Sequence, residues 1–175
     1  MESAVSGLKR VAVLAAPLLL AACSGSHEKT ALFCPTVSVL TQANQMVKAR
    51  GDATSVGARE ISARITGVAG RCATHGKNGV LTVFRVGFAA TRGPALIGDQ
   101  ITLPYFIVLT QGDQIIGKQI DPITFDFKNG RNRAVATTKP IKIEMPNAPV
   151  SAQQEALIGF QFKQSPQTGT TGDQH

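Results

Sequence analysis

The chain has 175 residues, of which 18 are Lys or Arg and 11 are Asp or Glu, giving a formal net charge of +7 at pH 7. It has one tyrosine and no run of five basic residues, so it lacks the basic, aromatic-rich stretches typical of nucleic-acid-binding chains. The length suits a single domain, and we expect the positive charge to serve solubility or to attract acidic partners.

A cleavable export signal is predicted over residues 1–22. Lys9 and Arg10 precede an apolar run, Val11–Leu20, and two alanines follow it. The run is well short of the roughly 20 apolar residues that a membrane-spanning helix needs. The residues at its end, Leu20-Ala21-Ala22-Cys23, resemble the lipobox of bacterial lipoproteins. Ordinary secretory cleavage is the alternative, and it would leave Cys23 as a free thiol.

The lipobox resemblance implies an anchor and a location. In bacterial lipoproteins the cysteine carries several acyl chains, which together hold the protein stably at a membrane. Ser24 stands where some lipoproteins have an aspartate that retains them at the inner membrane. The resemblance therefore implies a lipid-anchored protein of the bacterial outer membrane that faces the periplasm. Residues 23–33 are the predicted tether, and the ten residues between Cys23 and Cys34 reach at most about 35 Å.

The predicted globular domain covers residues 34–163 and contains the other two cysteines, Cys34 and Cys72. An exported pair predicts one structural disulfide, whose loop closure is worth roughly 4 kcal/mol. We expect this bond to tie the first strand to the end of the second instead of pinning opposite sheets. The alternative is a metal site at Cys72 and His75, but zinc usually takes three or four ligands, so neither a metal nor a cofactor is expected.

In the first half of the domain, alternating apolar and polar residues indicate strands with one buried face. Gly and Asn separate two of these segments and predict a turn. On the strand that follows this turn, Arg85 is expected to be an outer-face charge. The predicted elements are strands over 35–40, 60–72 and 80–90, a connection over 41–57 with a helical turn over 43–50, and a turn over 74–79.

Ile101–Leu109 is the most apolar stretch after the export signal. Phe106 and Val108 lie on the face opposite Leu103, so both faces need cover or a partner. Pro104 predicts an edge position or a bulge, because proline cannot donate a ladder hydrogen bond. The alternative is a central buried strand.

Turn residues divide the rest of the chain into shorter elements. Asn129-Gly130 is the strongest hairpin signal among them. The predicted elements are a loop over 91–100, a hairpin loop over 111–114, a strand over 115–127 bent at Asp121-Pro122, a strand over 133–145 with a break or edge at Pro140, a helical turn from Ser151 to Gln154, a last strand through Phe162, and a disordered tail over 164–175.

These elements predict an all-β fold, an antiparallel immunoglobulin-like β-sandwich of about seven strands, with a small β-barrel as the alternative. The chain has no tryptophan and so lacks the buried core Trp of antibody domains. Four short motifs make the domain similar to uncharacterised lipoproteins of α-proteobacteria. The resemblance implies an envelope location and this fold, and it implies no active-site residues. The motifs are Cys34-Pro35, Gly67-Val68-Ala69-Gly70-Arg71-Cys72, Arg92-Gly93-Pro94-Ala95 and Leu103-Pro104-Tyr105-Phe106.

No nucleotide-binding glycine motif and no His-Glu-x-x-His occurs, and Ser26-x-x-Lys29 falls in the tether, so we do not expect an enzyme. The predicted function is a protein-interaction or adaptor module that binds another envelope protein through a sheet edge or the apolar strand bearing Phe106 and Val108. The alternative is a binder of a small or acidic envelope ligand, a lipid or a glycan. Its candidate residues are Arg92, Arg131 and Arg133, which otherwise are solvated loop charges.

Overall fold

The structure is a computed structural model, and it describes residues 34–51, 53–146 and 153–162. All of them belong to one compact unit, Ala31–His175. The predicted export signal, Cys23, the tether, Ser151 and the polar tail lie outside the described residues.

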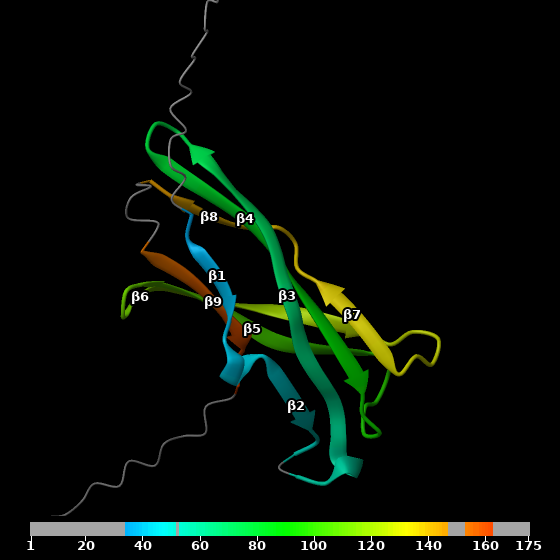
Figure 1. Ribbon diagram of the computed structural model, residues 1–175. Helices are drawn as coiled ribbons and strands as arrows, with labels where there is room; N and C mark the ends of the chain where they lie inside the picture. The colour runs from blue at the N-terminus through cyan, green and yellow to red at the C-terminus, as the bar shows by residue number, and fades with distance from the viewer. Residues whose placement is uncertain (1–33, 52, 147–152, 163–175) are drawn as a thin grey trace, which may run out of the picture. The chain divides into compact units, whose positions relative to one another are not determined.

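Nine strands and two short 3-10 helices make up the described part of the chain (Figure 1). The strands are β1 (Thr36–Val39), β2 (Gln45–Ala49), β3 (Arg59–His75), β4 (Gly79–Arg92), β5 (Gln100–Gln111), β6 (Gln114–Asp126), β7 (Arg133–Thr137), β8 (Ile141–Met145) and β9 (Gln154–Phe160), and the helices are η1 (Thr41–Ala43) and η2 (Val56–Ala58).

The strands form two sheets, which confirms the predicted all-β sandwich. Sheet A has the order β1-β9-β5-β6, and sheet B has the order β2-β3-β4-β7 with β8 also paired to β4. All pairs are antiparallel except β1 with β9. In Figure 1, β5 and β6 cross the long β3–β4 hairpin. The strand order differs from the ABED and CFG sheets of immunoglobulin domains, because β2, β3 and β4 are neighbours both in sequence and in space.

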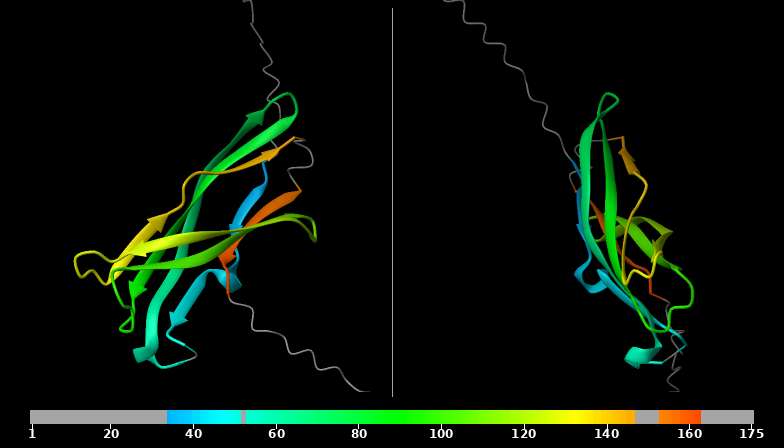
Figure 2. Two further views of the ribbon diagram at one scale, coloured as in Figure 1. Left: turned by 180° about the vertical axis from the view of Figure 1, so that it is seen from behind. Right: turned by 90° about the vertical axis from the view of Figure 1, so that its right-hand side faces the viewer.

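The β3–β4 hairpin is the longest feature of sheet B, and both views of Figure 2 show it extending past the β5–β6 pair toward its turn. The turn follows His75, where Gly76 has φ of 64°, as the glycine-rich sequence predicted. On β4 every second side chain is buried: Val80, Thr82, Phe84, Val86, Phe88 and Ala90. Arg85 falls between them and is exposed on the outer face, as predicted.

The predicted connection over 41–57 contains a strand that the sequence did not predict. Residues Gln45–Ala49 form β2 and pair with β3, with Met46 opposite Ala63. Met46 is the one buried side chain of this five-residue edge strand, so little alternation marks it. The helical turn expected over 43–50 is wrong, because most of that range is β2 and the 3-10 helix η1 ends at Ala43.

The predicted edge or bulge at Pro104 is wrong, because β5 lies between β9 and β6 and its register shift comes later, at Leu109 and Thr110. Pro104 fits because its carbonyl accepts the backbone N–H of Gln161 at 3.0 Å, just beyond the end of β9. A residue in an antiparallel pair directs its N and O to the same side. The nitrogen of Pro104 therefore also faces Gln161, where the ladder between β5 and β9 ends and no further N–H donor is required.

β6 runs without interruption through Asp121-Pro122, where the sequence predicted a bend. Pro122 lies opposite Pro104 on the outer strand of sheet A. Because Pro104 faces β9, Pro122 directs its nitrogen away from β5, where no ladder hydrogen bond is required. The strand therefore continues through Asp126.

Asn129-Gly130 forms a turn, but it does not close a hairpin. Both residues have positive φ, 60° and 68°. The turn carries the chain from β6 in sheet A to β7 in sheet B, so it connects the two layers. The predicted break at Pro140 is confirmed, since β7 ends at Thr137, β8 begins at Ile141, and both pair with β4.

The core lies where the sheets cross and is built around Phe88. Its ring centroid is 5.3 Å from that of Tyr105, 5.6 Å from that of Phe160 and 6.5 Å from that of Phe125. These tilted and edge-to-face arrangements are the favoured geometries for aromatic pairs. Phe88 belongs to sheet B and the other three to sheet A, so this cluster joins the two layers.

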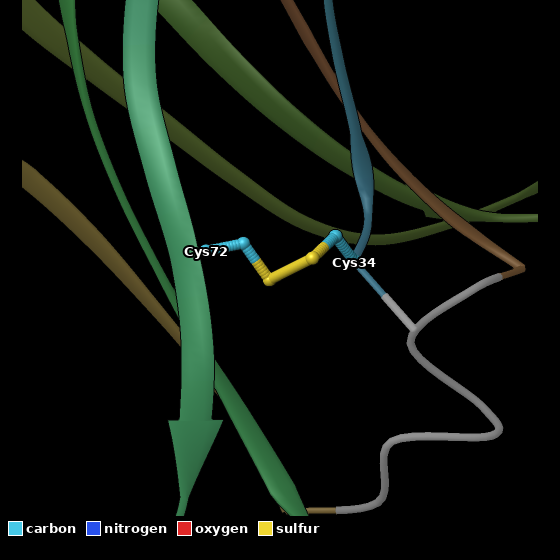
Figure 3. The surroundings of a disulfide bond; sticks show 2 residues. All are labelled: Cys34 and Cys72. Carbon is cyan, nitrogen blue, oxygen red and sulfur yellow. A yellow bond between two sulfur atoms is a disulfide. The ribbon is translucent and has the colours of Figure 1, made fainter. Parts of the chain in front are cut away.

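The disulfide joins Cys34 to Cys72, as predicted, with 6.0 Å between the two Cα atoms. Figure 3 shows it bridging β3 and the segment that leads into β1. β1 belongs to sheet A and β3 to sheet B, so the bond does pin opposite sheets, and the expectation that it would not is wrong. The expectation failed because β1 pairs with the distant β9 and not with a strand near it in the sequence.

Candidate functional site

A polar hollow lies beside the free edge of β6, and we call it the edge cleft. It has a volume of about 570 Å³ and lies between β6 of sheet A and the β7–β8 break of sheet B. Its lining combines the phenol of Tyr105, the carboxylate of Asp121 and the amide of Gln119 with the segment that joins β7 to β8. The lining residues are Tyr105, Gln119, Asp121, Pro122, Ile123 and residues 137–142.

Tyr105 links the edge cleft to the core. Its ring packs on Phe88, the residue is only 4% exposed, and it pairs with Asp121 across β5 and β6. Burial, followed by the charge of Asp121 and a hydrogen bond to it, raises the pKa of Tyr105 to about 12. Gln119 donates from Nε2 to Oδ2 of Asp121 at 2.7 Å. The phenol therefore stays protonated at neutral pH, and it suits hydrogen bonding better than proton abstraction.

The outer side of β6 is a free strand edge, since no described strand pairs with β6 on that side. Counting by twos from Pro122, the backbone groups of Ile120 and Lys118 also point away from β5. All residues from Gln111 to Ile120 are exposed. Their N–H and C=O groups are available to another extended chain.

Three isoleucines lie along this free edge, and Ile115, Ile116 and Ile120 are 67%, 46% and 51% exposed. Leu109 pairs with Gly117 and Thr110 with Ile115, which leaves Ile116 as the extra residue of a β-bulge. The edge therefore presents apolar side chains beside its backbone donors and acceptors.

Phe106 and Val108, the predicted interaction residues, are covered within sheet A. Val108 is 8% exposed, and Phe106 is half-buried. A Cβ built on Gly159 would lie 2.6 Å from the Phe106 ring, so this ring rests directly on the glycine. Lys118 covers the ring from β6, with its Nζ 5.5 Å from the centroid. The strand of Phe106 is central, as the alternative interpretation held, and the free edge is on β6.

The three predicted arginines do not form one site. Arg92 has structural contacts: it donates to the Leu96 carbonyl at 3.1 Å, pairs with Asp99 at 3.6 Å and stacks on Phe127 at 5.9 Å. It therefore holds the loop between β4 and β5. Arg131 and Arg133 are exposed at the turn between β6 and β7.

The edge cleft was not predicted from the sequence. Its walls come from β5, β6 and the β7–β8 break. The sequence marked Asp121-Pro122 and Pro140 as special positions, but no pattern in it indicated that these segments lie side by side. Cys72 is bonded to Cys34, so its sulfur is not available for the alternative metal pair with His75. Across the residues described, no three His, Cys, Asp or Glu side chains come together as metal ligands do. In the same residues, no helix has the length and apolar character needed to cross a membrane.

Comparisons of the chain with protein-family models, with curated proteins and with solved structures gave no match.

Proposed function

We propose that the chain is a lipid-anchored bacterial envelope protein, at the outer membrane and facing the periplasm, that binds an extended segment of another envelope protein without catalysis. The observation that carries the binding function is the free edge of β6, exposed from Gln114 to Ile120 and lined by three isoleucines. Strand addition at such an edge gains main-chain hydrogen bonds and side-chain contacts together.

Two features support the envelope location. The segment Leu20–Cys23 has the lipobox pattern. The Cys34–Cys72 disulfide suits an oxidising compartment outside the cytoplasm. Mass spectrometry of the protein from its host tests the anchor, with acylated Cys23 at the new N-terminus as the expected result and an uncut leader or an unmodified thiol as the contradicting one.

The binding function is tested by crosslinking in native membranes with a pair of substitutions at one position. Lys118→Pro removes an outward N–H from the free edge without removing a hydrogen bond to β5. Lys118→Ala removes the same side chain and keeps the N–H. We expect one reproducible protein partner for the wild type and Lys118→Ala, and at least tenfold less of it for Lys118→Pro.

Thermal unfolding of both variants shows whether the sandwich is intact, and Pro122 on the same edge indicates that β6 tolerates proline. Equal capture by the two folded variants, or capture that depends on neither, would refute binding at the β6 edge.

A further inference from the structure

Three cations from separate parts of the chain lie together on the outer face of sheet B. Arg71 of β3 and Lys142 of β8 both pair with Val83 of β4, and Arg85 is two residues along β4 on the same face. All three cations are exposed, while the alternate β4 residues are buried. We call Arg71, Arg85 and Lys142 the basic patch.

The charges of the basic patch are not used in ion pairs among the described residues, whose salt bridges are Lys48–Glu60, Arg92–Asp99 and Lys128–Asp126. A shallow hollow of about 440 Å³ lies at the patch and is lined in part by Arg71, Val83, Arg85 and Pro140. Lys139 is exposed beside Pro140. On the same face the nearest carboxylate by register is that of Glu144, which pairs with Leu81. The patch therefore combines a depression with a net positive charge.

The basic patch lies near the N-terminal side of the domain, from which the segment with the proposed anchor at Cys23 extends. Cys72 adjoins Arg71 and is bonded to Cys34, with 6.0 Å between their Cα atoms. The ten residues between Cys23 and Cys34 span at most about 35 Å. Lys77, in the turn of the β3–β4 hairpin, is exposed just beyond the same end of β3. An acylated Cys23 would thus keep these cations close to the membrane surface.

We propose that the basic patch docks on anionic phospholipid headgroups of the membrane that holds the anchor, so that the domain is held by acyl chains and by its own surface. This inference rests on the lipid anchor of the proposed function. Each Lys or Arg near an anionic bilayer strengthens binding by about fivefold, and the effect fades within roughly one Debye length. Arginine also suits phosphate, because its guanidinium donates two parallel hydrogen bonds.

Vesicle sedimentation tests this docking on the chain from Ser24 onward, which lacks acyl chains and keeps the compact unit Ala31–His175 with all described strands and the disulfide. We expect binding to vesicles of phosphatidylcholine with about one-third phosphatidylglycerol, weakening with salt, and at least tenfold less binding to pure phosphatidylcholine. Arg71→Glu with Arg85→Glu should lower the partition coefficient at least tenfold.

The matched control is Arg131→Glu with Arg133→Glu, which makes the same change in net charge at the other end of sheet B. Arg133 pairs with Thr91, eight residues along β4 from Val83, or roughly 26 Å away. We expect this control to bind within about twofold of the wild type. Equal losses in the two double variants would show a response to net charge alone and would overturn the patch, as would the absence of binding to anionic vesicles.

Amine labelling of the anchored protein gives a second measurement. We expect Lys77 and Lys142 to react at least threefold more slowly in anionic membranes than in detergent, and Lys128, in the β6–β7 turn, to react equally in both. Unchanged labelling of Lys77 and Lys142 beside an acylated Cys23 would overturn the docking and leave the anchor standing. An unmodified Cys23 would remove the anchor, and vesicle binding would still report on the patch alone.

Discussion

The middle of the sandwich and its disulfide end hold the two sheets together by different means. In the middle, Phe88 contacts Tyr105, Phe125 and Phe160, and these four aromatic side chains fill the space between the sheets. At the disulfide end, the sheets leave a hollow of about 240 Å³ lined by residues such as Pro35, Val68 and Thr82.

The disulfide end has an unpaired polar group as well as this hollow, because the buried Oγ1 of Thr82 has no hydrogen-bond partner among the described residues. The Cys34–Cys72 bond spans the sheets at this end. Apolar burial therefore holds the sheets together where they cross, and a covalent bond joins them where the β3–β4 hairpin extends past the crossing (Figure 2).

The largest effect is expected in the middle. Phe88→Ala should lower the free energy of unfolding by about 3–5 kcal/mol, because it removes the ring that contacts three others and leaves a cavity. Urea unfolding measures the loss. Val135→Ala, at a side chain 84% exposed on the same sheet, should change the free energy by less than about 0.5 kcal/mol. A cost below about 1 kcal/mol for Phe88→Ala would show that the aromatic cluster is not what joins the sheets.

At the disulfide end, Cys34→Ser with Cys72→Ser should lower the free energy of unfolding by about 2–4 kcal/mol, given a sequence separation of 38 residues. Hydrogen exchange separates the two regions. Amides of β1 and of β3 beyond Gly67 should lose protection more than those paired around Phe88. Equal loss of protection in both regions would mean that the disulfide stabilises the whole sandwich and not its end.

The regions also differ in how well their sequences predicted them. Alternation over Glu60–Ile65 predicted β3, and a dominant apolar face over Val80–Ala90 predicted β4, because the sheet has one buried face there. β2 was missed, since it buries only Met46. The sequence also did not predict which sheet contains β1, because β1 pairs with β9, which is more than a hundred residues away. Alternation within a strand indicates which face is buried, but it does not indicate which distant strand is its partner.

The same limit applies to the candidate sites. The basic residues are dispersed in the sequence, and the register of β3, β4 and β8 brings Arg71, Arg85 and Lys142 together. The free edge was expected on the strand of Phe106 because Pro104 cannot donate a ladder hydrogen bond and because that stretch is the most apolar. Sheet order, which places β5 in the centre and β6 outside, decides which strand is free, and the composition of one strand does not.

Thr138 lies at the boundary between the two regions, where β4 passes from β7 to β8. Its backbone N–H donates to the Val86 carbonyl at 3.0 Å, and its Oγ1 accepts the Val86 N–H at 3.0 Å. Thr138→Val should lower the free energy of unfolding by about 1–3 kcal/mol, because it leaves a buried N–H without a partner. Thr138→Ser keeps the acceptor and should recover most of this loss. Equal unfolding midpoints for the two variants would show that the hydroxyl does not join the regions.

Tyr105 gives the smallest effect and a way to follow the core through its own titration. It is the only tyrosine of the chain, so the absorbance of tyrosinate reports on this residue alone. Its pKa in the folded protein is raised from 10.0 to about 12, first by burial and then by Asp121. The folded state therefore holds the phenolic proton more tightly than the unfolded state does. The resulting stability is fully present below pH 10 and is lost as the pH rises through 12.

At about pH 11 the wild type should have lost about 1.4 kcal/mol that Tyr105→Phe does not lose. Urea unfolding of both proteins at about pH 9 and about pH 11 measures this difference, since other groups titrate alike in the two. Equal losses, together with a tyrosinate transition near pH 10, would mean that water reaches the hydroxyl freely through the edge cleft. A tyrosinate transition near pH 12 would instead show that the hydroxyl is shielded from solvent, as the buried core around Phe88 is. Water in the edge cleft would then not reach it.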